Sequence, residues 1–130
     1  MSIAEKWKGV NVATFAADWL QEIRSGADVP DGFGSKVVLM DFTAPPEIKW
    51  AFLQAAVDSA ETDDELGSIA AGPFENLLGH HGDKYIDLVE ARCRKDAKFA
   101  RMTTAAYRHM MSDDIWSRVQ AIQAAVPNPL

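Results

Sequence analysis

The most constraining feature of this sequence is a helical spacing of apolar residues that returns along the whole chain. Near the start it steps by three or four residues, through Val12, Phe15, Ala16, Trp19, Leu20 and Ile23. Residues 47–60, 62–78, 83–95, 96–110 and 112–122 repeat it. A lone strand could not satisfy its backbone groups, and no pair of strands is evident. The chain is therefore predicted to be all-α: one domain over 1–130, an array of about seven short antiparallel helices, loosely HEAT-like.

The segment S-K-V-V-L-M-D-F, residues 35–42, is the ambiguous one. Its adjacent valines favour a strand. Because no partner strand is evident, a short helix capped by Ser35 is the preferred prediction, with an extended segment as the alternative. Residues 47–60 are apolar on most faces, which predicts a central helix. Residues 1–10 and 126–130 are expected to be loosely ordered ends.

Residues 62–82 have the clearest local pattern. Thr62 followed by Glu65 predicts a capping box, in which the Thr62 side chain accepts from the Glu65 N–H and the carboxylate reaches back to the Thr62 N–H. Gly67 lies in the middle of this helix, where glycine is unfavourable. It is therefore expected to mark the close approach of another helix.

Four further residues of the same stretch are expected to break the chain into short helices. Gly72 and Pro73 should stop the first helix, with Pro73 at the first position of the next one, where its missing N–H costs nothing. Gly79 or Gly82 should end that second helix in a left-handed conformation. A helix, a sharp corner and a second short helix are predicted.

Length, charge and cysteine content narrow the class of protein. A chain of 130 residues can bury a core, and a net charge of −6 argues against general nucleic-acid binding. The single cysteine excludes an internal disulfide and fits a reducing compartment. No secretory signal or membrane-length apolar run is evident. We expect a cytoplasmic protein that does not bind membranes.

Several motifs together carry a family resemblance. They are I-A-A-G-P-F-E-N-L-L-G-H-H-G over residues 69–82, V-E-A-R-C-R-K-D-A-K-F after it, P-E-I-K-W before it and I-W-S-R-V near the end. The chain resembles an uncharacterised bacterial family, a domain of unknown function with the core I-A-A-G-P-x-E-x-L-L-x-x-H-G, over roughly residues 45–120. The resemblance implies an all-helical, loosely HEAT-like domain and no particular activity.

His80, His81, Glu75 and Glu90 form the only cluster of ligand-type groups in the sequence. They are weak catalytic candidates for a small enzyme or metal-dependent hydrolase. The favoured reading is structural, with one histidine capping a helix end, the other solvated, and Glu90 in a buried pair with an arginine or histidine. A metal site needs three or four converging ligands, so no metal and no cofactor is expected.

Cys93 has two readings. Neighbouring basic residues lower the pKa of a thiol, which would favour a reactive cysteine. Its position on the same helix face as Ile86 and Val89 favours an inert, buried side chain, and no base can be assigned to activate it. We expect Cys93 to fill space.

Charge is unevenly distributed along the chain. Residues 84–109 hold seven basic and three acidic residues. Four of the basic residues step by four, three and seven and can share one stripe: Arg94, Lys98, Arg101 and Arg108. An acidic edge is formed by Asp58, Glu61, Asp63, Asp64 and Glu65. Both sets are either solvated faces or a dipolar docking surface.

The favoured function is a small protein-interaction or accessory module of the immunity or regulatory kind, rather than an enzyme. The partner is expected to be another protein, bound through the basic stripe. One core is predicted to hold Trp19, Phe52, Ile69, Leu77, Val89, Phe99 and Trp116.

Overall fold

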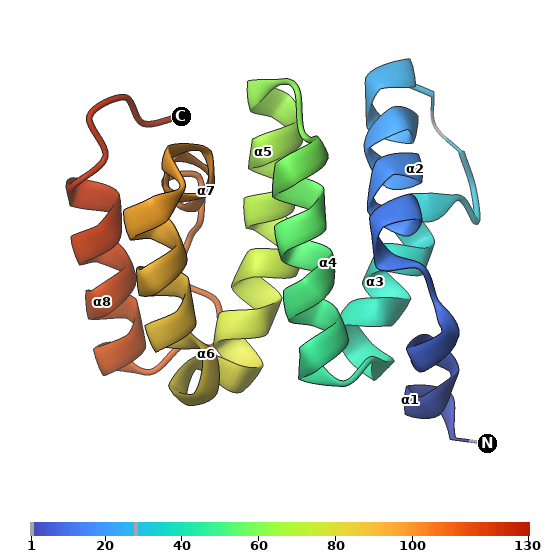
Figure 1. Cartoon of the computed structure of the whole chain (residues 1–130), viewed down its shortest axis with the longest axis horizontal. Coiled ribbons are helices and arrows are strands. Elements are labelled where there is room, and N and C mark those ends of the chain that lie inside the picture. The colour runs from blue at the N-terminus through green and yellow to red at the C-terminus, as the bar shows by residue number, and fades with distance from the viewer. Residues whose placement is uncertain (1, 28) are drawn as a thin grey trace.

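A computed structural model describes residues 2–27 and 29–130 of the chain. The chain is 77% helical, and no strand occurs in this part, which confirms the predicted all-α class. The helices form a single compact arrangement, in which they stand side by side and the two chain ends lie at opposite ends of the row (Figure 1).

Most α-helices begin at residues that the sequence patterns mark, but the helix expected over residues 96–110 ends early, at Thr103. They are α1 Ile3–Lys6, α2 Val12–Ser25, α3 Phe33–Thr43, α4 Pro46–Ser59, α5 Asp63–Ile69, α6 Glu75–Lys95, α7 Ala97–Thr103 and α8 Asp113–Ala124. A 3₁₀ turn, η1, covers Trp7–Gly9, and a π-helical turn, η2, covers Ala70–Phe74. The side chains of Asn11, Thr62, Asp96 and Ser112 each cap the helix that follows.

Residues 35–42 are helical, as preferred, but the predicted cap is wrong. The helix begins earlier, at Phe33, and Ser35 lies inside it. The carboxylate of Glu22 on α2 accepts from the backbone N–H of Phe33 at 2.7 Å and of Gly34 at 3.3 Å. Another helix therefore supplies the cap, which local spacing could not reveal.

The prediction that Gly72 and Pro73 stop the helix is also wrong. Helical backbone continues from α5 through η2 into α6. Pro73 has no N–H to donate to the carbonyl four residues before it. The turn widens instead, and the N–H of Glu75 reaches the carbonyl of Ala70, five residues back. The wider turn, which contains one extra residue, accommodates Pro73 without ending the helix.

No left-handed glycine ends the helix after η2 either. Among the described glycines only Gly26, at the end of α2, has a positive φ, at 66°. Helical backbone is interrupted at His81, with φ −136° and ψ 29°, and then resumes to Lys95. The expected terminus at Gly79 or Gly82 is therefore a kink inside α6.

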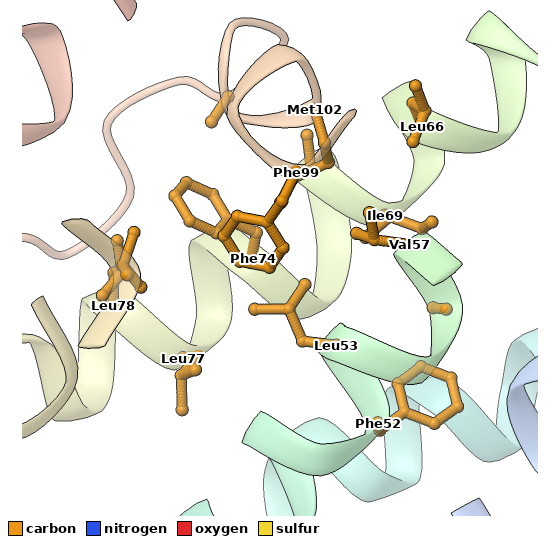
Figure 2. Close-up of a cluster of buried hydrophobic side chains, with 14 of the residues drawn as sticks. Phe52, Leu53, Val57, Leu66, Ile69, Phe74, Leu77, Leu78, Phe99 and Met102 are labelled. Atoms are coloured by element: carbon orange, nitrogen blue, oxygen red, sulfur yellow. The ribbon is translucent and has the colours of Figure 1, made fainter. Parts of the chain in front are cut away.

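The core lies between α4 and the helices packed on it from both sides (Figure 2). Phe52 and Leu53 of α4 are fully buried, as are Phe74 and Phe99 from η2 and α7. Six of the seven predicted core residues are buried; they are Trp19, Phe52, Ile69, Leu77, Val89 and Phe99. Trp116 is the exception, because it packs against the core while remaining partly exposed.

Candidate functional site

Helix α3 has apolar side chains on two opposite faces. Val37 and Met40 are buried in the core, 4% and 0% exposed. Val38, Leu39 and Phe42 are 55%, 48% and 77% exposed on the other side. Spacings of one, three and four residues place these three on one face of the helix. We call them the α3 outer face. No residue in the described part of the chain covers this face.

The inner side of α3 also carries a buried charge that sequence reasoning missed. Asp41 is 9% exposed, and its Oδ1 atom has no hydrogen-bond partner among the described residues. Burial raises the pKa of Asp41 to about 7, opposed by the positive charge of Lys49. Lys49, on α4, is 5% exposed and donates to Oδ1 of Asn76 at 3.1 Å. A buried polar cluster therefore joins α3, α4 and α6.

Gly79 and Gly82 are required by packing rather than by backbone conformation. A Cβ atom on Gly79 would lie 2.4 Å from the backbone oxygen of His109. A Cβ on Gly82 would lie 3.0 Å from the side chain of Ile115. The loop after α7 and the start of α8 thus pack directly on α6. Gly67 meets nothing within 4 Å, so the close approach predicted there is wrong.

Alanine at these two helical glycines is expected to have opposite effects. Gly79→Ala should lower the free energy of unfolding by roughly 1–3 kcal/mol, because its methyl group meets backbone that must move. Gly67→Ala should raise it by roughly 0.5–1 kcal/mol, since alanine favours helix and has free space. Urea unfolding of both variants checks this pair; a Gly79→Ala protein as stable as wild type would contradict it.

His80 and His81 line a pocket of about 390 Å³ at the kink in α6. Asp83, Lys84 and Ser112 contribute its other polar side chains. His80 is exposed and His81 is half-buried. Burial, followed by the charges of Lys49, His80 and Lys84, lowers the pKa of His81, so its neutral form is favoured.

The two glutamates of the predicted cluster are held elsewhere. Glu75 accepts a hydrogen bond from the backbone N–H of Tyr107 at 3.1 Å, and burial raises its pKa. Glu90 is paired with Arg118 of α8, which also binds Asp87 at 2.5 Å. Hydrogen bonding to Arg118 lowers the pKa of Glu90. Glu90 is thus paired with an arginine, as expected, but the pair is partly exposed rather than buried, and the partner comes from α8 rather than from nearby in the sequence.

Of the four residues, only the two histidines meet in the pocket. Among residues 2–27 and 29–130, no group of three or more His, Cys, Asp or Glu side chains is arranged to hold a metal ion.

Three members of the predicted basic stripe are bound within the molecule. Lys98 donates to the backbone oxygen of Asp58 at 3.3 Å. Arg101 holds both carboxylate oxygens of Asp63, at 2.5 and 3.1 Å, and Arg108 binds Asp113 at 2.7 Å. Arg94 alone in the stripe has no ion pair or hydrogen bond from its side chain to any described residue. Two of the four stripe residues, Lys98 and Arg101, therefore contact residues of the acidic edge.

Glu65 is not part of an exposed acidic edge. Its side chain is 0% exposed and pairs with Arg24 of α2 at 2.6 Å. Burial acts to raise the pKa of Glu65, but hydrogen bonds from Arg24 and Thr62 outweigh it and lower the pKa. Half of the predicted capping box is present, because the Thr62 side chain accepts from the N–H of Glu65. The Glu65 carboxylate accepts instead from the hydroxyl of Thr62 and from the N–H of Glu61. The Glu65 carboxylate therefore pairs with Arg24 of α2 instead of completing the predicted capping box.

A groove of about 530 Å³ runs between the α6–α7 corner and α8. Twelve residues line it: Glu90, Cys93, Arg94, Ala97, Ala100, Arg118, Ala121, Ile122, Ala125, Val126, Pro127 and Asn128. Burial raises the pKa of Cys93 to about 12, so the neighbouring arginines do not activate it. Sequence reasoning placed Cys93 in the core, whereas its half-buried side chain lines this groove.

These features define a helical-array protein with an exposed apolar face on α3, a polar pocket at the kink in α6 and an apolar groove beside α8. The chain belongs to the family of unknown function DUF6869, whose model matches residues 27–126. No curated protein and no solved structure matches it. Across the described residues, every helix is too short or too polar to cross a membrane.

Proposed function

We propose that the chain is a small accessory module that acts by binding another protein, and that the α3 outer face is its binding surface. The observation that supports this most strongly is the exposure of Val38, Leu39 and Phe42 on one side of α3. A helix with apolar residues all round is normally buried on all sides. Exposed apolar patches commonly mark interaction surfaces.

The other face of α3 explains why this surface is presented rigidly. Val37, Met40 and Ala44 anchor the helix in the core, and Glu22 of α2 caps its start. At its end, the hydroxyl of Thr43 accepts a hydrogen bond from the Trp7 indole N–H at 2.9 Å. Such a fixed helix presents side chains at i, i+1 and i+4, which suits an apolar groove or helix on the partner.

The basic stripe supports this proposal less well than α3 does. Lys98, Arg101 and Arg108 already have contacts within the molecule. Each would have to give up such a contact to bind a partner, which offsets part of the gain. We therefore place the main binding surface on α3, with Arg94 as the stripe member free to contribute.

Photo-crosslinking in the native host tests the proposed surface. Benzoylphenylalanine at position 42 should form an adduct with one or a few proteins, because Phe42 is 77% exposed on the apolar face. The same group at Tyr107 is the matched control, since that side chain is 78% exposed but lies outside α3, in the loop after α7. Adducts at position 42 that match those at 107 would contradict the proposal.

A Val38→Asp change, introduced into the position-42 probe, should remove the adduct while leaving the fold intact. Val38 is 55% exposed, so its replacement is expected to change the free energy of unfolding by only about 0.5 kcal/mol. Thermal unfolding and adduct yield are measured on the same variant. Persistence of the adduct at full yield would show that the apolar face is not what the partner binds.

A further inference from the structure

We infer that the groove between the α6–α7 corner and α8 binds a peptide segment that has a large apolar side chain and a carboxylate close together. This second site is separate from the α3 outer face and does not depend on it. It is supported by the shape of the groove, by the small side chains that line it and by the charge at its rim.

Small side chains leave the space that an apolar anchor would fill. Ala97 and Ala100 of α7 face Ala121 and Ala125 of α8 across the groove. Cys93 lies among them and lines the groove as well. A volume of about 530 Å³ is within the range of ligand-binding clefts, which are usually apolar with a few polar groups. A leucine or phenylalanine from a partner would bury its side chain here.

The two arginines that line the groove differ in how they are bound. Arg118 is committed to Asp87 and Glu90, so it has little to offer a ligand. Arg94 lines the groove, is exposed, and makes no ion pair within residues 2–27 and 29–130. A bidentate partner for a free guanidinium is most naturally a carboxylate. We therefore expect the acidic residue of the ligand to bind Arg94.

The wall formed by the chain end is held in place. Arg101 donates from Nε to the backbone oxygen of Asn128 at 2.7 Å. The backbone N–H of Leu130 donates to Oγ1 of Thr104 at 2.9 Å. Because these contacts fix the wall before any ligand arrives, binding would cost little ordering of the groove.

Selection from random 12-residue peptides displayed on phage tests the inference. The enriched peptides should share one leucine or aromatic residue with an aspartate or glutamate close by. The best peptide is then synthesised with a fluorophore, and its affinity is measured by fluorescence anisotropy. Arg94→Glu should weaken it at least about tenfold, whereas the matched change Lys95→Glu, next to it and outside the groove, should weaken it less than about twofold.

Cys93 offers a second readout that does not rely on affinity. It is the only cysteine of the chain, so thiol labelling reports on the groove alone. Saturating peptide should slow labelling at least about fivefold at pH 9, where a small fraction of thiolate is present. Unchanged labelling would mean that the peptide binds elsewhere and would overturn the inference.

Two further outcomes would also overturn it: no enriched peptide, or equal losses for Arg94→Glu and Lys95→Glu. The Val38→Asp protein should bind the peptide as wild type does. This comparison keeps failure of the groove distinct from failure of the α3 outer face.

Discussion

Truncation of Phe52 to alanine is expected to lower the free energy of unfolding by about 3–5 kcal/mol. Phe52 is 0% exposed, and its ring lies 4.8 Å from that of Phe15 and 5.7 Å from that of Trp19, between ring centroids. The change therefore opens a cavity where α2 packs on α4, and closely packed interiors recover such losses only in part. Equilibrium unfolding in urea measures the difference.

Phe42→Ala is the matched control for that experiment. It removes the same atoms from a side chain that is 77% exposed, so the free energy of unfolding should change by no more than about 0.5 kcal/mol. A loss below about 1 kcal/mol at Phe52 would mean that the contact between α2 and α4 is looser than the burial of this ring indicates.

Asp41→Asn is expected to stabilise the protein at pH 8 by roughly 2–4 kcal/mol and to have little effect near pH 4. Burial raises the folded pKa of Asp41 from 3.8 to about 7. The folded state thus binds more protons than the unfolded state between these values. The free energy of unfolding of the wild type therefore falls as the pH rises through this window, and asparagine removes that fall.

Part of the gain is offset by Lys49: burial lowers the pKa of this lysine, and the negative charge of Asp41, which asparagine removes, opposes that shift. Urea unfolding of both proteins at several values between pH 4 and pH 8 measures the difference. Asp18→Asn, which makes the same change of side chain at an exposed position of α2, is the control. Parallel curves for wild type and Asp41→Asn would contradict the expectation.

Helical periodicity predicted the fold class because a helix that buries one face has apolar residues every three or four positions in its sequence. The cap at Thr62 could be predicted because it acts within three residues along the chain. Pro73 was misread because local rules give a proline two outcomes, a helix start or a break. The choice of a widened turn depends on the tertiary packing of the helices on either side.

The candidate sites were less predictable, because each depends on residues far apart in the chain. Arg118 reaches Glu90 from 28 positions away, and Lys49 reaches Asn76 from 27. Spacing on one helix cannot show which side chain of another helix will face it. The exposure of Phe42 was equally hidden, since an apolar residue in a helix is expected to face the core.

The wide turn at Ala70–Phe74 also sets the direction in which the side chains at the start of α6 point, relative to those of α5. Ile69 and Leu77 are eight residues apart, and both are 0% exposed. At about 100° per residue, an uninterrupted α-helix would point them about 80° apart. A turn that absorbs one extra residue reduces this offset to about 20°. The wide turn takes up one residue between α5 and α6. The apolar faces of these two helices therefore stay aligned on both sides of Pro73.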